Sequence, residues 1–481
     1  MRSIRFAAAL AAMLIAALLL GGCKDSTPSG PVAGMGNTTV TKYVAIGNSL
    51  TAGYQSGGLF QSGQIYSYPN LIAGQLNLAG ASVGSFEMPL YSDPGTPDPK
   101  TGKASRYEIL SMTGPVIGPA GAPPGAPINL TLARPYDNLG IPGAVIYDFL
   151  DTTSFLAKAG PPRNNPLFSL VLRNSVMGKN ILQQASALHP DLVTFWLGNN
   201  DVLGYATSGG VSPSAPTSSA AFGALYAQAL GALRAALPNA KIVVANIPNV
   251  TCVPYFTTVG PRVAASLPAG YYLRYQKHGN TSLAFDSTRF TEATPPFITL
   301  PGQTYALLIG HPSGKWYRDN GVALPAGIDT TKPFGLHPQN PWPDALMLDA
   351  DEQAVAAGAV SAFNGIIASQ ASVNGAAVVD INLFFTGIKA NGLLVSGQEF
   401  TADYVSGGLF SLDGVHPSSR GQAVVANEFL RVINGKFGTS IPMVDVGTVP
   451  GIPSPLAKGA AGLQVDPSLY QTMQDLFGSS R

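Results

Sequence analysis

Two residues near the carboxyl end of the chain have the types and spacing of a proton-transfer pair. The segment SLDGVHP at 411–417 places Asp413 three residues before His416, with a glycine between them. A carboxylate in such a turn can bind one imidazole nitrogen and leave the other free to take a proton from a serine. Of the five histidines, only His416 follows an acidic residue in this way. We therefore predict that Asp413 and His416 belong to a catalytic triad.

A candidate nucleophile lies near the amino end. The apolar run YVAIG at 43–47 predicts a buried strand, which is followed by Asn48 and Ser49 and then by a helix candidate. In α/β sheets, ligands bind beyond the carboxyl ends of the strands. Ser49 would lie there, with its N–H group directed at a developing oxyanion. Strand–glycine–serine turns are common, so this segment alone fits a structural serine equally well.

Two further segments could contribute to an oxyanion site. FWLGNND at 195–201 ends a predicted strand in two amides and an aspartate, and NLGIPG at 138–143 is a Gly/Pro-rich turn. An asparagine N–H at the end of a strand is a natural oxyanion donor. Asparagine and aspartate are also ordinary turn residues. From composition alone, these segments are either donors or turns.

The remaining pattern alternates between strands and helices. Predicted strands lie at 43–47, 128–133, 191–197, 241–247 and 376–381, and predicted helices at 68–78, 178–188, 218–237, 349–371, 418–434 and 467–477. Such alternation indicates a parallel sheet covered on both faces. Segments 82–137 and 252–344 are rich in Pro, Gly and aromatic residues and are interpreted as ordered insertions. Segment 441–481 is predicted to be a carboxyl-terminal extension.

The four segments, in this order, resemble the blocks of the SGNH (GDSL-like) hydrolases. The family's serine, glycine, asparagine and histidine match Ser49, Gly143, Asn200 and His416, with Asp413 preceding the histidine. The resemblance spans residues 43 to about 434. It implies a flavodoxin-like three-layer α/β/α domain over 41–440, with a roughly five-stranded parallel sheet and large loop insertions.

The resemblance also implies a mechanism. Ser49 would attack an ester, His416 and Asp413 would complete the triad, and Ser49, Gly143 and Asn200 would hold the oxyanion, without metal or cofactor. Two positions depart from the family pattern: Asn48 replaces an aspartate, and Asn199 replaces a second glycine. Neither belongs to the triad, so we expect activity to survive. The long spacing between Ser49 and Gly143 indicates a large insertion near the site.

The amino terminus has the pattern of an exported lipoprotein. Two arginines precede an apolar run at 6–20, which is typical of a secretory signal. The run ends in LGGC, which resembles a bacterial lipobox, so residues 1–22 are predicted to be a signal peptide and Cys23 to be lipidated. Residues 23–40 would then form the lipidated cysteine and a flexible tether. We expect a protein of the cell envelope, anchored through Cys23 at the bacterial outer membrane or cell surface.

The charge composition argues against nucleic acid as a partner, and the cysteine count argues against a disulfide framework. Lys plus Arg is 27 and Asp plus Glu is 26, a net charge of +1, so no basic field exists for nucleic acid. With Cys23 lipidated, only Cys252 remains, and it is interpreted as a buried apolar residue.

The sequence leaves three functions open. The first is an esterase or lipase, for which we favour lipid or fatty-acyl esters as substrates. The second is a carbohydrate O-acetyl esterase acting on acetylated sugars. The third is a non-catalytic surface lipoprotein on an esterase scaffold. The aromatic residues of the second insertion could stack on sugars, line an acyl groove or belong to the core: Tyr271, Tyr272, Tyr275, Trp316, Tyr317 and Trp342.

Overall fold

The computed structural model describes residues 33–478, apart from 112–114, 152–164, 174–176, 178–179, 212–214, 278–284 and 453–462. The predicted signal peptide, Cys23 and most of the predicted tether lie outside the described residues.

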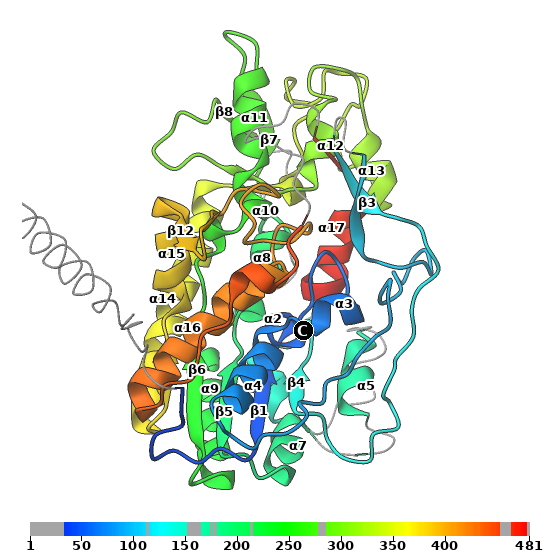
Figure 1. Ribbon diagram of the computed structural model, residues 1–481. Coiled ribbons are helices and arrows are strands. Elements are labelled where there is room, and N and C mark those ends of the chain that lie inside the picture. Colours follow the sequence, from blue (N-terminus) through cyan, green and yellow to red (C-terminus); the bar gives the residue numbers. More distant parts are fainter. Residues whose placement is uncertain are drawn as a thin grey trace, which may run out of the picture.

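A five-stranded parallel sheet forms the centre of the molecule, as predicted (Figure 1). Its spatial order is β11-β6-β5-β1-β4. The strands are β1 (Tyr43–Gly47), β4 (Asn138–Gly140), β5 (Leu192–Trp196), β6 (Lys241–Ala245) and β11 (Ala377–Val379). All four pairings are parallel, so the carboxyl ends of the strands meet at one edge.

Helices cover both faces of this sheet. Neighbouring residues of β5 point to opposite faces. Trp196 packs against α4 (Tyr68–Leu78) and α16 (Ser419–Phe437), through Tyr68 and Phe429. Phe195 packs on the other face against Tyr226 of α9 (Ser219–Ala236), which lies beside α7 (Ile181–Ala187) and α14 (Ala350–Val373). The predicted three-layer α/β/α arrangement is therefore confirmed.

The second predicted strand, at 128–133, is wrong. The backbone N–H of Ile128 binds the carbonyl oxygen of Leu90, and the side chain of Asn129 bonds to the backbone at Met88 and Leu90, so this run is a loop fastened to another loop. Ile128 and Leu130 are exposed, which removes the burial that a central strand requires. The edge strand β4 forms ten residues later than predicted, at 138–140.

Helix α14 is, by length and composition, the one helix among the described residues that could cross a membrane. A core helix of a globular domain meets the same criterion. Here α14 lies against α9, with the Phe363 ring stacked 3.9 Å from that of Phe222. Its first turn is capped by Asp349, whose carboxylate accepts the N–H of Glu352.

The two predicted insertions, and the segments that connect the elements of the central sheet, carry further short strands and helices. The small strands are β2 (Tyr107–Ser111), β3 (Val116–Pro119), β7 (Leu273–Gln276), β8 (Phe285–Thr288), β9 (Phe297–Ile298), β10 (Met347–Leu348), β12 (Leu393–Val395), β13 (Gln398–Phe400) and β14 (Gln464–Val465). The other described helices are α2 (Ser49–Ala52), α3 (Gln61–Gln64), η1 (Ile146–Phe149), α5 (Leu167–Leu172), α8 (Asn200–Thr207), η3 (Val250–Cys252), α10 (Pro254–Thr257), α11 (Val259–Ser266), α12 (Gly302–Ala306), α13 (Lys315–Asn320), η4 (Asp344–Leu346), α15 (Ile381–Asn391), η5 (Val446–Thr448), α17 (Ser468–Met473) and η6 (Gln474–Gly478).

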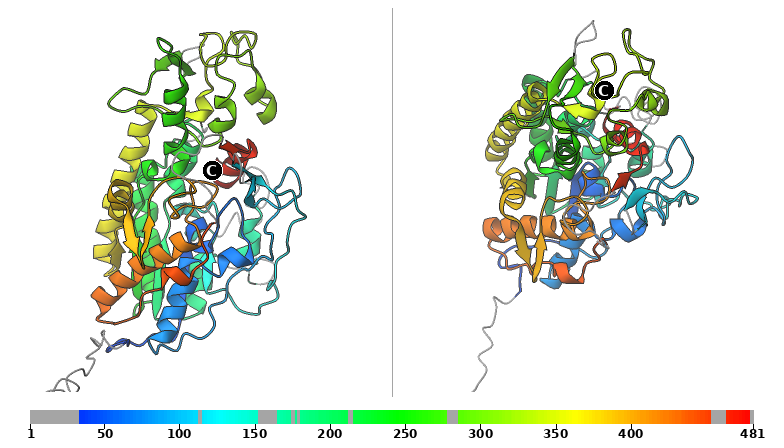
Figure 2. Two further views of the ribbon diagram at one scale, coloured as in Figure 1. Left: turned by 45° about the horizontal axis from the view of Figure 1, so that its top comes forward. Right: turned by 90° about the horizontal axis from the view of Figure 1, so that it is seen from above.

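The carboxyl-terminal extension packs against both insertions (Figure 2). Strand β14 pairs in parallel with β3, and the hydroxyl of Thr304 on α12 donates to the carbonyl of Val465. The phenol of Tyr107 bonds to the hydroxyls of Ser468 and Thr472 at 3.0 and 3.1 Å, which fixes α17. These contacts hold residues 464–477 on the body of the protein.

The first described residues are fastened near the end of α16, away from residues 464–477 of the extension (Figure 1). Gly34 forms an antiparallel bridge with Ser440, just beyond α16, and Thr38 donates to the carbonyl of Phe437. The chain then enters β1 at its amino end.

Candidate active site

Ser49 is the first residue of α2, directly beyond the carboxyl end of β1. The turn is tight: a Cβ atom on Gly47 would stand 2.9 Å from the carbonyl oxygen of Trp196 on β5. The side-chain oxygen of Asn48 accepts the N–H of Leu50 and caps the helix. This local structure points the Ser49 hydroxyl out of the sheet edge.

The imidazole of His416 links Ser49 to Asp413. Its Nε2 lies 2.9 Å from Oγ of Ser49, and its Nδ1 lies 3.0 Å from Oδ2 of Asp413. The turn at 411–417 produces this arrangement because Gly414 adopts a positive φ of 74°, which a side chain would disfavour. A hydroxyl, an imidazole and a carboxylate in this order can move a proton from the serine to the histidine.

The carboxylate of Asp413 is buried, and both of its oxygens accept hydrogen bonds. Oδ1 accepts the N–H groups of Val415 and His416, and Oδ2 accepts that of Gly57 at 3.1 Å. Burial by itself would raise the pKa of the Asp413 carboxyl, but the charge of His416 and these hydrogen bonds outweigh it and hold the pKa below its ordinary value. Asp413 is therefore ionised at neutral pH and fixes the orientation of the imidazole.

Two aromatic rings enclose His416. Tyr54 packs against the imidazole at 4.9 Å between ring centroids, and Phe477 of η6 stacks on it at 5.9 Å with an interplanar angle of 23°. Ser49 is 2% exposed and His416 1% exposed. The proton-transfer chain is thus shielded from solvent, in part by the carboxyl-terminal extension.

A small cavity of about 40 Å³ lies at Ser49 and His416, and Asn200 also lines it. One N–H of the Asn200 side chain donates to the carbonyl of Ala144, which leaves its second N–H for another acceptor. Asn48 and Asn199 also line this cavity. Nδ2 of Asn48 and both side-chain atoms of Asn199 have no hydrogen-bond partner among the described residues. The cavity therefore offers several amide donors beside the Ser49 hydroxyl.

Gly143 lies close to this cavity but does not line it among the described residues. Its φ is +83°, and a Cβ atom at this position would stand 2.6 Å from the carbonyl oxygen of Leu476 and 2.7 Å from Nδ2 of Asn165. The carboxyl-terminal extension thus lies against Gly143. The structure brings together Ser49, Asp413, His416 and Asn200, whereas Gly143 lies against Leu476 and Asn165 and is not among the residues that line the small cavity.

Several residues at the site carried no recognisable signal in the sequence. Gly57 belongs to a GGLF segment that reads as a loop tip, but its N–H supports Asp413. Asp201 reads as a turn residue, but its carboxylate accepts from Ile146 N–H and from the hydroxyl of Thr217 and so ties α8 to the segment after β4. Tyr54 and Phe477 cover His416. All four act through contacts between segments distant in the chain.

Other candidate residues lie away from the site. Four of the aromatic side chains in the second insertion are buried in the core, namely Tyr275, Trp316, Tyr317 and Trp342, whereas Tyr271 and Tyr272 are exposed. Cys252 is a buried free cysteine, as predicted, and burial raises the pKa of its thiol. Within the described ranges, no group of three or more histidine, cysteine, aspartate or glutamate side chains could hold a metal ion.

Comparison with known proteins yields a family match. A family model described as GDSL-like lipase/acylhydrolase matches residues 43–285, about half of the chain. The match includes Ser49, Gly143 and Asn200 and ends before Asp413 and His416. No curated protein matches the chain significantly.

Two solved structures are similar to the chain. One is described as a GDSL-like lipase from Parabacteroides merdae; it is 12% identical and has a TM-score of 0.31, and the match covers 83% of this chain and 98% of that one. The other is phospholipase A1 from Streptomyces albidoflavus NA297; it is 16% identical and has a TM-score of 0.29, and the match covers 83% of this chain and all of that one.

Proposed function

This chain belongs to the GDSL-like lipase/acylhydrolase family, and from that premise we propose that it hydrolyses carboxylic esters with Ser49 as nucleophile, His416 as general base and Asp413 as the orienting carboxylate. The observation that carries the proposal is the continuous hydrogen-bonded chain from Ser49 Oγ through His416 to Asp413.

The first half of the reaction forms an acyl-enzyme. Oγ of Ser49 attacks the ester carbonyl carbon while Nε2 of His416 takes the hydroxyl proton. The resulting oxyanion is stabilised by the N–H of Ser49, the side-chain amide of Asn200 and the N–H of Gly143. The imidazolium then gives its proton to the departing alcohol as the carbon–oxygen bond breaks.

The second half of the reaction, deacylation, regenerates the free enzyme. A water molecule loses a proton to His416 and attacks the acyl carbon, and the bond to Ser49 Oγ breaks as that oxygen regains the proton. Asp413 stays ionised throughout and stabilises the transient imidazolium charge, in keeping with the lowered pKa of its carboxyl. The products are a carboxylic acid and an alcohol, with no electron transfer.

The test uses p-nitrophenyl acetate and a fluorophosphonate probe. Wild-type protein should release p-nitrophenol and gain the mass of the phosphonyl group on Ser49, whereas Ser49→Ala should lose both by a factor of about 10⁴ or more. Ser186→Ala is a matched control, because that hydroxyl lies on α7 and bonds to the carbonyl of Gln183 in its own helix. Undiminished hydrolysis by Ser49→Ala would refute the proposal, and absence of any hydrolysis would favour a non-catalytic role.

We also propose that the protein is exported and anchored to the cell envelope through Cys23. The support is the sequence pattern of residues 1–23. Growth with radiolabelled palmitate should label the wild-type protein in the membrane fraction, and Cys23→Ser should abolish the label. An unlabelled wild-type protein would refute the anchor without bearing on the esterase.

A further inference from the structure

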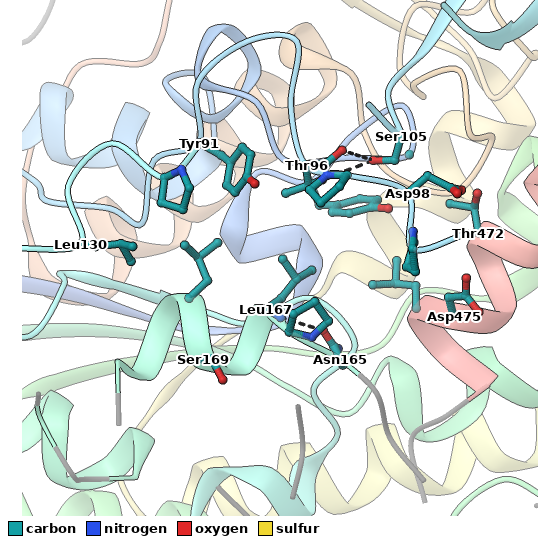
Figure 3. A pocket seen from close by; sticks show the side chains of 18 residues that line it. Tyr91, Thr96, Asp98, Ser105, Leu130, Asn165, Leu167, Ser169, Thr472 and Asp475 are labelled. Atoms are coloured by element: carbon teal, nitrogen blue, oxygen red, sulfur yellow. Dashed lines mark hydrogen bonds between the residues drawn. The ribbon is translucent and has the colours of Figure 1, made fainter. Parts of the chain in front are cut away.

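A larger pocket of about 370 Å³ lies beside the triad (Figure 3). Its walls come from four parts of the chain: the segment after α2, the insertion at 82–137, helix α5 with the two residues before it, and the carboxyl-terminal extension. Its volume lies within the range of about 300–1,000 Å³ that is typical of small-molecule sites. None of these walls belongs to the central sheet.

The lining is mainly apolar. Tyr91, Leu130, Leu167 and Leu170 contribute apolar side chains, and in Figure 3 Tyr91 and Leu130 lie on the side opposite Thr472 and Asp475. The carboxylate of Asp475 accepts a hydrogen bond from Gln471 at 2.6 Å, within its own helical segment. The pocket therefore has an apolar side and a polar side.

Part of the lining adjoins the triad. Tyr54 lines the pocket and packs against His416, and Gly57 lines it and donates to Asp413. Leu476 also lines it, and its carbonyl lies against Gly143. The next residue, Phe477, stacks on His416. Leu476 and Phe477 thus stand between the large pocket and the small cavity at Ser49.

Resting on the function proposed above, we propose that this pocket receives the acyl chain of the ester, and that Leu476 and Phe477 form a displaceable partition between the pocket and Ser49. The substrate class is esters of medium-length fatty acids. An apolar chain gains free energy with each methylene removed from water, which corresponds to about fourfold in affinity per methylene. An acetyl group would leave the pocket unfilled.

The partition explains why the triad is buried in this structure. Leu476 lies against Gly143, at the position that a side chain there would take, and Phe477 closes one face of His416. Displacement of these two residues would join the two cavities. The acyl carbonyl could then sit at Ser49 with its chain in the pocket.

The test compares chain lengths in wild-type protein and in pocket-filling variants. The kcat/KM for p-nitrophenyl octanoate should exceed that for the acetate at least tenfold. Leu167→Trp should cut the octanoate value at least tenfold and leave the acetate value within twofold. Leu78→Trp is the matched control, because Leu78 is 69% exposed at the end of α4 and outside the pocket; it should change neither value.

Leu130→Trp is a second pocket-filling variant, made in case Leu167→Trp does not fold. Leu130 also lines the pocket but is 42% exposed, so a larger side chain is tolerated there. Retained acetate hydrolysis reports an intact fold in either variant. The pocket assignment is overturned when a variant that retains acetate hydrolysis leaves the octanoate-to-acetate ratio unchanged.

Binding separates this proposal from the proposed function. Titration of Ser49→Ala with methyl octanoate should give saturable heat that Leu167→Trp in the same background abolishes. Saturable binding without ester hydrolysis in the wild type would refute the proposed ester hydrolysis and support the proposed acyl pocket. Hydrolysis without methyl octanoate binding would support ester hydrolysis and refute the acyl pocket.

Discussion

The two cavities beside His416 are built from different kinds of structure. The small cavity at Ser49 is lined largely by residues that follow strands of the sheet: Asn48 and Ser49 follow β1, and Asn199 and Asn200 follow β5. The larger pocket is lined mostly by an insertion, α5 and the chain's last helical turns, with Tyr54 and Gly57 on the side of the triad. In the proposed enzyme, the sheet carries the chemistry and the added segments carry the choice of substrate. Substitutions on the two sides should therefore change different kinetic quantities.

The largest effect is expected on the chemical side, from Asp413→Asn. An amide cannot stabilise the imidazolium or hold the required tautomer, so kcat should fall by about 10⁴-fold. The octanoate-to-acetate ratio should stay as in the wild type, because the pocket is untouched. Steady-state kinetics with both esters measures this. A changed ratio would contradict the proposal that the small cavity carries the chemistry and the larger pocket selects the acyl chain.

Asn200→Ala should have the next largest effect. Loss of an oxyanion donor costs about 10²–10³ in kcat. Asn199→Ala serves as the neighbouring comparison, because Asn199 lines the same cavity but does not match the family's asparagine. It should reduce kcat less than tenfold, so equal losses in the two variants would contradict the assignment of Asn200.

A smaller effect, of opposite sign, is expected from Phe477→Ala. Removing the ring that stacks on His416 weakens the partition, so fluorophosphonate should label Ser49 several-fold faster. Mass spectrometry at timed intervals gives the rate. Phe285→Ala, on the partly exposed strand β8, is the control and should leave labelling unchanged. Slower labelling in Phe477→Ala would mean that the ring supports the active geometry instead of blocking it.

The smallest effect concerns pH and Asp475. Burial raises the pKa of this carboxyl, while the hydrogen bond from Gln471 and the charge of Lys100 lower it in part. A raised pKa means that the packed segment binds the proton more tightly than the released one, so packing weakens as pH rises through that pKa. Asp475→Asn should therefore protect residues 468–477 from hydrogen exchange more than wild type near pH 8, and by a smaller margin near pH 4, close to the ordinary aspartate pKa of 3.8. Identical exchange at both pH values would contradict this account.

Much of the sheet and its flanking helices could be predicted because their signals are local. The run at 43–47 and the helix at 68–78 have the observed bounds, and the strand in β5 differs from its predicted range by one residue at each end. The failure at 128–133 shows the limit of such signals, because apolar alternation there serves a loop that is anchored through Asn129.

The candidate site also has a part that could be predicted from local sequence and a part that could not. Ser49, Asn200 and the 413–416 turn each follow from short motifs next to strands or helices. The contact between Gly143 and Leu476 could not be predicted, because Leu476 is more than 300 residues away and belongs to no motif. Contacts such as that between Tyr107 and Ser468 are set by tertiary packing and leave no periodic trace in either segment.

The bridge between Gly34 and Ser440 gives the domain a polarity. Strand β1 runs from that end of the sheet toward Ser49, so Gly34 lies at the end of the sheet opposite the nucleophile. A domain tethered by its amino terminus would therefore present its reactive pole outward, away from the point of attachment, and would meet molecules arriving from the surroundings before those lying beneath it.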